Sequence, residues 1–347
     1  MFASRTISVI VFVLVASLPC LAQSGSRGAS SGSLQPSFQS SSPALSLPTD
    51  SFATPQTISD GGILSQPSTG SDISASTNQT PDAGSGANSR IPDASLVDPI
   101  FQINDHGSQI VIDHSPWDCF LSKYRVIDCE CIARIKYGQV SCADRLLLCN
   151  YLRQLQSTDT RTLNRDEQLA FWFNLYNARV VALVLDHYPL RSIRRIKQNL
   201  TDFVGPFDDA GAVTVLGRPL SLNDIESGII RPIWRDPRIH YALNCASYGC
   251  PDLAATAWTA DDLDARLDTA AYNFINSDRA VKKGLFGLRV SKIYKWYKAD
   301  FGDDDQSIIC HLMRYANCRT REKLNKKQKI SSYAYKWSLN DAKSSCR

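Results

Sequence analysis

The composition of this chain changes abruptly near residue 97, and that change limits how much of the chain can fold. Residues 23–97 are rich in Ser, Gly, Pro, Thr and Ala, contain no Cys or Lys, and have Phe38 and Phe52 as their only aromatic residues. A segment of this kind cannot bury enough apolar surface to offset the entropy lost on ordering. We therefore predict a disordered stalk over 23–97, suited to O-glycosylation, and a globular domain over 98–320.

The first 22 residues have the pattern of an export signal. Arg5 supplies the positive start, the run from Ile7 to Val15 is the apolar core, and the signal ends near Ala22. This apolar run is too short to span a bilayer, and no later stretch approaches the roughly 20 apolar residues that a span needs. We predict a signal peptide over 1–22, a secreted protein and no transmembrane segment.

Positive charge is concentrated at the C-terminal end of the chain. Residues 321–347 hold eight Lys or Arg and two Asp or Glu, a net charge of +6, whereas the whole chain has a net charge of +4. Because Arg5 contributes +1, residues 23–320 have a net charge of −3. We therefore expect no nucleic-acid surface on the domain and interpret 321–347 as a solvated basic tail. Attraction of this tail to an anionic surface or polysaccharide is the alternative.

Ten cysteines remain once Cys20 is removed with the signal peptide, and an even number in an exported protein indicates disulfide bonds. They form an early group, a late group and a central pair: Cys119, Cys129, Cys131, Cys142 and Cys149; Cys310, Cys318 and Cys346; Cys245 and Cys250. The two outer groups could form four bridges, of which one or three would join the early group to the late one. The central pair would then be either bridged or free.

No motif for a cofactor is present. The chain has no glycine-rich phosphate loop and no Gly-x-Ser-x-Gly elbow, and the spacing of Cys129 and Cys131 does not match a zinc finger. We predict no cofactor and no metal. Two N-glycosylation sequons begin at Asn78 and Asn199, and they predict a glycoprotein in a eukaryotic host.

Helices and short strands alternate without a regular strand–helix–strand rhythm, which favours an α+β fold. We predict a mostly helical single domain around a small sheet. The expected helices are one that starts at Ser115-Pro116, 143–154, 165–188, 221–230, 261–277 and 304–316, and the expected strands are 109–113, 212–216, 239–243 and 288–291. We expect Ser115 to cap the first helix, Asn164 to cap 165–188, and Ser221 with Asp224 to cap 221–230. A turn at Gly217 should end the strand 212–216.

The strongest predicted helix, 165–188, carries an unusual polar stripe. Glu167, Ala170, Asn174 and Asn177 follow one another at spacings of three and four, which places them on one face. Buried amides must be hydrogen-bonded, so we interpret the stripe as a structural contact with an adjacent loop. Positioning of a catalytic group is the alternative.

The segment 238–253 contains the largest group of side chains capable of catalysis, namely His240, Asn244, Cys245 and Cys250. In one hypothesis Cys245 attacks a carbonyl as a thiolate and His240 acts as its base. Asn174, Asn177 or Asn244 would then orient the imidazole or donate to an oxyanion. Such a site would resemble papain-like or transglutaminase-like hydrolases and would make the protein a cysteine-dependent hydrolase or acyl-transferase.

Three observations oppose that hypothesis. Along a strand, His240 and Cys245 would fall on opposite faces; papain-like enzymes place the Cys before the His; and a Cys245–Cys250 disulfide is sterically possible. A bridged turn with a core histidine is therefore the favoured interpretation, and a redox-active dithiol is a further alternative. Without catalysis, the domain would be a disulfide-stabilised binding module on a flexible stalk that presents a groove to a peptide, protein or glycan.

Several blocks together resemble the family known as domain of unknown function 547. They occur in the family's order within residues 113–302: Ala170–Ala178, Leu220–Glu226, Asp236–Ser247, Cys250–Pro251 and Tyr294–Gly302. The resemblance implies that Cys245 is the family's usual cysteine, and that Cys250-Pro251 stands where plant-type members often have Ser-Pro. The early cysteines and the basic tail lie outside the family pattern. Since no activity defines this family, the resemblance predicts a fold rather than a reaction.

Overall fold

The computed structural model describes residues 90–196, 207–209 and 211–342. All of them belong to one compact unit, Ala75–Arg347. The predicted signal peptide, the predicted stalk up to residue 89, both sequons and Cys346 lie outside the described residues.

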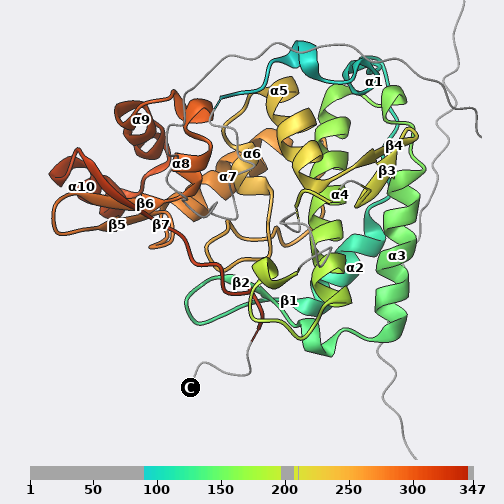
Figure 1. The fold of residues 1–347 in the computed structure, drawn as a ribbon, viewed down its shortest axis with the longest axis horizontal. Helices are drawn as coiled ribbons and strands as arrows, with labels where there is room; N and C mark the ends of the chain where they lie inside the picture. The colour runs from blue at the N-terminus through green and yellow to red at the C-terminus, as the bar shows by residue number, and fades with distance from the viewer. Residues whose placement is uncertain (1–89, 197–206, 210, 343–347) are drawn as a thin grey trace, which may run out of the picture. The chain divides into compact units, whose positions relative to one another are not determined.

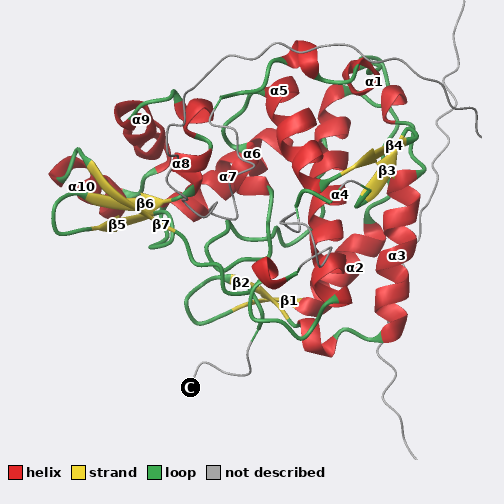
Figure 2. Cartoon of the chain, in the orientation of Figure 1, coloured by secondary structure: helices red, strands yellow, loops and turns green. Residues whose placement is uncertain are grey.

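Short strands and mostly longer helices alternate along the described chain, as Figure 1 and Figure 2 show, and the α+β prediction is confirmed. The helices are α1 Pro99–Gln102, α2 Ser115–Tyr124, α3 Cys142–Gln156, α4 Arg165–Asp186, α5 Arg231–Trp234, α6 Ile239–Ala242, α7 Leu263–Ile275, α8 Ile293–Trp296, α9 Asp305–Tyr315 and α10 Cys318–Lys326. The strands are β1 Arg125–Ile127, β2 Ala133–Ile135, β3 Val213–Val215, β4 Arg218–Leu220, β5 Val281–Lys283, β6 Leu288–Ser291 and β7 Ile330–Ala334. Single 3-10 turns occur at 94–96, 137–139, 160–162, 193–195 and 298–301, and a π-helix spans Asp224–Ile230.

Helix α4 is the centre of the larger hydrophobic core. Its N-cap is Asn164, whose side-chain oxygen accepts a hydrogen bond from Glu167 N at 2.9 Å, so the cap predicted from the sequence is confirmed. The helix is long and apolar enough to cross a bilayer, yet 94% of its most apolar window is buried inside the protein. Helix α3 packs against both α4 and α2, which lie side by side with it in Figure 1. We therefore interpret α4 as the core helix of this unit.

A second hydrophobic core lies under the three-stranded sheet. Strand β6 is in the middle, antiparallel to β5 and parallel to β7, and helices α7 and α9 contribute Phe274, Ile308 and Leu312 to the same core. Residues 321–347 therefore do more than form a solvated tail: β7 comes from them, and Leu324 and Ile330 are buried. The alternation of Tyr333, Tyr335 and Trp337 was the signal for a strand here.

Other local predictions were confirmed. Strand β3 forms within the expected range 212–216, and the expected turn at Gly217 joins it to β4, with Val215 paired to Arg218. Ser221 and Asp224 cap each other's backbone: Asp224 N donates to Ser221 Oγ, and Ser221 N donates to Asp224 Oδ2.

Two strand predictions were wrong. Residues 109–113 form no strand, and Ile112 N donates to the side chain of Glu167 instead of to a neighbouring strand. Residues 239–243 form the short helix α6 rather than a strand. A short, fully buried run fits a helix as well as a strand, and all four residues of α6 are buried.

The cap predicted for α2 is also wrong, because His114 and not Ser115 occupies the N-cap position.

No disulfide joins two of the nine described cysteines, so the four bridges considered for the outer groups are not seen among the described residues. Eight of the nine are free thiols, and the ninth, Cys129, is disulfide-bonded. Cys119, Cys131, Cys142, Cys149, Cys310 and Cys318 are exposed. The central pair, Cys245 and Cys250, is also free, so the predicted bridged turn is wrong for this structure.

Candidate functional site

The polar stripe of α4 holds two segments of backbone in place. Asn174 donates to Trp258 O and accepts from Trp258 N, both at 2.9 Å. Asn177 does the same one turn later, donating to Ala242 O at 2.9 Å and accepting from Asn244 N at 2.8 Å. Both amides are buried and satisfied, which matches the structural interpretation of the stripe. Both amide groups bind backbone, and no hydrogen bond joins either of them to an imidazole among the described residues.

His240 lies in a buried ionic cluster. Its Nε2 is 2.6 Å from Asp300 Oδ2, and the same carboxylate is held by Arg231 through two hydrogen bonds of 2.7 and 2.8 Å. The side chains of His240, Arg231 and Asp300 are 1%, 0% and 7% exposed. Charges this deeply buried are tolerated only when they are paired. The three side chains therefore form one electrostatic unit that joins α6 to the turn after α8.

Glu226 approaches the same imidazole from the other side. Its Oε1 lies 3.5 Å from His240 Nδ1, and its Oε2 accepts a hydrogen bond from Tyr176 OH at 3.3 Å. Burial alone would lower the pKa of His240, but the contacts with Asp300 and Glu226 outweigh burial and raise it. The two carboxylates therefore favour the protonated form of the imidazole.

This arrangement separates His240 from Cys245. Each ring nitrogen of His240 faces a carboxylate, and Tyr297 stacks on the ring with a centroid distance of 3.9 Å. Among the described residues, no hydrogen bond joins His240 to Cys245. A catalytic base must reach its nucleophile directly or through one water molecule, and its free nitrogen must face that nucleophile. The structure does not bring this dyad together.

Cys245 has its own set of polar neighbours. Its Sγ lies 3.0 Å from Tyr335 OH and 3.3 Å from Ser247 Oγ, while its backbone N–H donates to Cys250 Sγ at 3.0 Å. Burial raises the pKa of the thiol, but hydrogen bonds from Cys250, Ser247 and Tyr335 together bring it down to about 7. Cys250 is buried and its pKa is raised. The two thiols therefore differ strongly in acidity.

The turn that carries both thiols is fixed by Asn244 and by the C-terminal segment. Asn244 donates to Pro251 O at 2.7 Å and accepts from Ala246 N at 2.9 Å. Gly249 N donates to Lys336 O at 2.9 Å, and a Cβ atom on Gly249 would stand only 2.8 Å from Lys336 N. The close approach of the two backbones explains why a glycine is needed at this position. Asn244 is therefore a structural residue of the turn.

A cleft with a volume of about 1250 Å³ opens beside this turn. It is lined by the β1–β2 hairpin, by the segment 248–258, by α7, and by β6 and the end of β7. Tyr248, Gly249 and Tyr335 belong to its wall, so the Cys245 turn borders the cleft although Cys245 and His240 do not line it.

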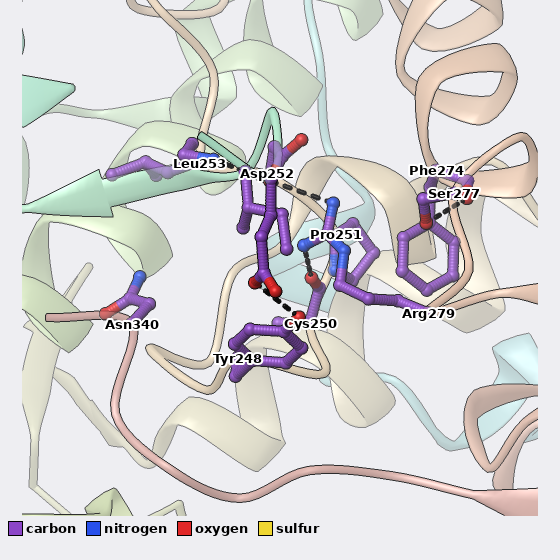
Figure 3. Close-up of polar contacts among 12 residues, drawn as sticks. Tyr248, Cys250, Pro251, Asp252, Leu253, Phe274, Ser277, Arg279 and Asn340 are labelled. Atoms are coloured by element: carbon purple, nitrogen blue, oxygen red, sulfur yellow. Dashed lines mark hydrogen bonds and ion pairs between the residues drawn. The ribbon is translucent and has the colours of Figure 1, made fainter. Parts of the chain in front are cut away.

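Three arginines hold one wall of the cleft in place by binding backbone carbonyls. Arg279 donates to Cys250 O at 2.7 Å, pairs with Asp252 at 3.0 Å and lies over Phe274, as Figure 3 shows. Arg125 donates to Leu253 O at 2.7 Å, and Arg266 donates to two carbonyls at 256 and 257. The wall is therefore rigid, and these three guanidinium groups are already engaged.

The cleft is nevertheless strongly basic. Its lining contains seven basic and three acidic residues: Arg125, Arg266, Arg279, Lys282, Arg289, Arg319 and Lys336; Glu130, Asp252 and Asp278. Arg289 and Arg319 are exposed and have no ion pair or side-chain hydrogen bond among the described residues. The ammonium group of Lys336 lies 3.9 Å from the centre of the Tyr248 ring and has no ion pair among them. Six of these seven basic residues lie within residues 23–320, which have a net negative charge, so positive charge is concentrated at the cleft.

Residues 160–275 match the family model described as protein of unknown function, DUF547. The chain contains a DUF547 domain. The match confirms the resemblance found in the sequence blocks over this segment, which runs from the turn before α4 to the end of α7. Neither the curated proteins nor the solved structures gave a match to the chain.

The DUF547 segment contains His240, Cys245 and the two asparagines of α4, but it does not contain all of their partners. Asp300 and Tyr335 come from later in the chain. Sequence reasoning did not assign Glu226 or Arg231 to the site either. An ionisable side chain inside an apolar stretch, such as Glu226 before Ile229 and Ile230, was the available signal, because a buried charge requires a partner. Among the described residues, no group of three or more His, Cys, Asp or Glu side chains is arranged to hold a metal ion.

Proposed function

We propose that this DUF547 protein is a secreted binding module that holds an acidic peptide segment in the basic cleft. The observation that carries the proposal is the charge of the lining, seven basic against three acidic residues, with Arg289, Arg319 and Lys336 on the rim without acidic partners among the described residues. Guanidinium groups bind carboxylates through two parallel hydrogen bonds, so an acidic ligand is the complement of this surface.

A peptide fits the lining better than a glycan does. Aliphatic side chains such as Ile127, Leu253 and Val290 alternate with the basic ones around the cleft. A segment with both acidic and apolar side chains would satisfy both kinds of contact, and the volume of about 1250 Å³ is larger than the roughly 300–1,000 Å³ of small-molecule sites. The rigid wall built by Arg125, Arg266 and Arg279 favours binding, because a preformed site loses little entropy when it is occupied.

The geometry around His240 supports binding over catalysis. Both ring nitrogens face carboxylates, and the asparagines of α4 are occupied by backbone. A hydrolase that uses Cys245 with His240 as its base would have to break the buried cluster first. The cluster supports the domain instead, because it ties α6 and the π-helix to the segment after α8.

The test is a fluorescence anisotropy titration of the full chain with a labelled peptide of alternating Glu and Leu. We expect binding that weakens with added salt, and about tenfold or greater loss in Arg289→Ala/Arg319→Ala. Arg191→Ala/Arg195→Ala removes two exposed arginines away from the cleft and is the charge-matched control. Equal loss in both double variants, or equal affinity for a Gln–Leu peptide, would overturn the proposal. Binding of a sulfated glycan in place of the peptide would do so as well.

A second candidate function rests on the thiol of Cys245. Its pKa of about 7 provides a thiolate near neutral pH, and Tyr335 OH at 3.0 Å is the group placed to return a proton to a leaving group. This would be a cysteine-dependent hydrolase or acyl-transferase without a histidine base. Alkylation at neutral pH followed by peptide mass spectrometry tests it: selective, rapid labelling of Cys245 is required, and labelling no faster than that of the exposed cysteines would rule it out.

A further inference from the structure

The hairpin of β5 and β6 ends in two adjacent large apolar residues that the fold leaves uncovered. Leu285 and Phe286 are each 82% exposed, the highest values among the large apolar side chains of the described residues. Exposed apolar side chains are common singly, whereas an adjacent pair at a hairpin tip is a feature of surfaces that bind a partner or a membrane.

Backbone hydrogen bonds hold the tip of this hairpin in a fixed position. Gly284 N donates to Gly287 O at 2.8 Å across the turn, and Leu288 N donates to Lys329 O at 2.8 Å. A Cβ atom on Gly287 would stand 2.6 Å from Lys329 O, so the hairpin is packed closely against the start of β7. Its neighbours therefore anchor the turn while Leu285 and Phe286 remain exposed to solvent.

Basic residues surround the tip. Residues 281–291 contain Lys282, Lys283 and Arg289 and no acidic residue, a net charge of +3. The neighbouring segment 318–330, which forms α10 and leads into β7, contains six basic residues and Glu322, a net charge of +5. Figure 1 shows β5, β6 and α10 together at the edge of the described part. A hollow of about 430 Å³ at the base of the tip is lined by Lys282, Lys283 and Arg289 with Ser331 and Ser332.

We propose that this tip docks the protein on a membrane that contains anionic lipids. Leu285 and Phe286 enter the boundary between headgroups and acyl chains, and the hollow with its lysines, arginine and serine hydroxyls receives a lipid phosphate. Apolar contact and electrostatic attraction are each marginal alone, and together they give stable binding. Charge complementarity favours an anionic membrane over a protein partner, because residues 281–291 contain no acidic residue and basic residues outnumber Asp278 and Glu322 around them.

Co-sedimentation of the full chain with lipid vesicles tests this docking site. We expect the protein to pellet with vesicles of phosphatidylserine and phosphatidylcholine, and to remain in solution with phosphatidylcholine alone. Leu285→Ala/Phe286→Ala should weaken binding at least tenfold, because both side chains enter the lipid. Lys282→Ala/Lys283→Ala should weaken it by about fivefold for each charge removed, and added salt should weaken binding of the wild type.

The matched control is Leu146→Ala/Leu147→Ala, which removes an exposed apolar pair from α3 (60% and 52% exposed) outside the basic region. This control should bind vesicles like the wild type. The proposal is overturned if Leu285→Ala/Phe286→Ala sediments like the control, if neutral vesicles bind equally well, or if the tip variant abolishes self-association of the chain instead of vesicle binding. Leu285 and Phe286 do not line the basic cleft, so a failure here leaves the proposed peptide binding unaffected.

Discussion

His240 Nε2 lies 2.6 Å from Asp300 Oδ2, with both side chains buried and sixty residues apart in the sequence. The contact ties the DUF547 segment to a residue outside it. Because Arg231 binds the same carboxylate, Asp300 neutralises two cationic groups at once.

Removing the charge of Asp300 should therefore destabilise the fold. Asp300→Asn leaves the buried Arg231 and His240 without their carboxylate, and loss of one partner of a buried ion pair costs roughly 3–5 kcal/mol. Urea unfolding followed by circular dichroism measures the change. Asp264→Asn is the control, since Asp264 is 82% exposed and Arg238 retains two other carboxylates. Equal effects of the two substitutions would show that the cluster is not structural.

Acid should destabilise the domain through two other histidines. Burial lowers the pKa of His114 to about 4 and that of His311 to about 4, and each neutral ring contacts a buried tyrosine hydroxyl. Since the unfolded chain binds a proton near pH 6.5 and the folded one does not, stability falls as the pH drops from about 6.5 to 4, by roughly 1 kcal/mol per pH unit for each histidine. Unfolding free energies measured across this range check the slope. A His114→Gln/His311→Gln variant should show a shallower dependence, and an unchanged slope would contradict the assignment.

The amide of Asn174 should matter because of the backbone that it binds. Asn174→Leu leaves the N–H and C=O of Trp258 buried without partners, at about 1–3 kcal/mol for each unsatisfied group. Thermal and urea unfolding measure the loss. Asn150→Leu, at an exposed position of α3, should change stability by less than about 0.5 kcal/mol. A catalytic role for Asn174 would instead leave stability unchanged.

The hydroxyl of Tyr335 should control the acidity of Cys245. Tyr335→Phe removes a hydrogen bond of 3.0 Å from the thiol, so the pKa of Cys245 should rise above about 7. The pH profile of Cys245 alkylation, read by peptide mass spectrometry, would then shift to higher pH. Tyr248→Phe is the control, because its hydroxyl donates to Glu130 rather than to the thiol. Identical profiles for the wild type and Tyr335→Phe would refute this role.

Local signals were enough to predict the features that depend on neighbouring residues. The cap of α4 at Asn164, the reciprocal pair of Ser221 and Asp224, and the turn at Gly217 all depend on residues within a few positions of one another. The interpretation of Asn174 and Asn177 as structural amides also followed from spacing alone. The caps and the turn form within one short stretch of sequence, whereas the spacing of the two asparagines showed only that they share a helix face and not that they bind Trp258, Ala242 and Asn244.

Features that depend on distant partners could not be predicted in this way. The run at 239–243 is short and α6 within it is buried on every side, so no periodicity distinguishes the strand that we expected from the helix. The positions of His240 and Cys245 are set by Asp300 and Tyr335, which come 60 and 90 positions later. The cleft is lined by segments between β1 and β7, so no single stretch of the sequence predicts that its lining is basic.

The central claim is that the basic cleft, and not the thiol, carries the function. Titration of the full chain with the labelled Glu–Leu peptide should show wild-type affinity for Cys245→Ser and a loss of about tenfold or more for Arg289→Ala/Arg319→Ala. The opposite pattern, with affinity lost in Cys245→Ser and retained in the arginine variant, would contradict the account.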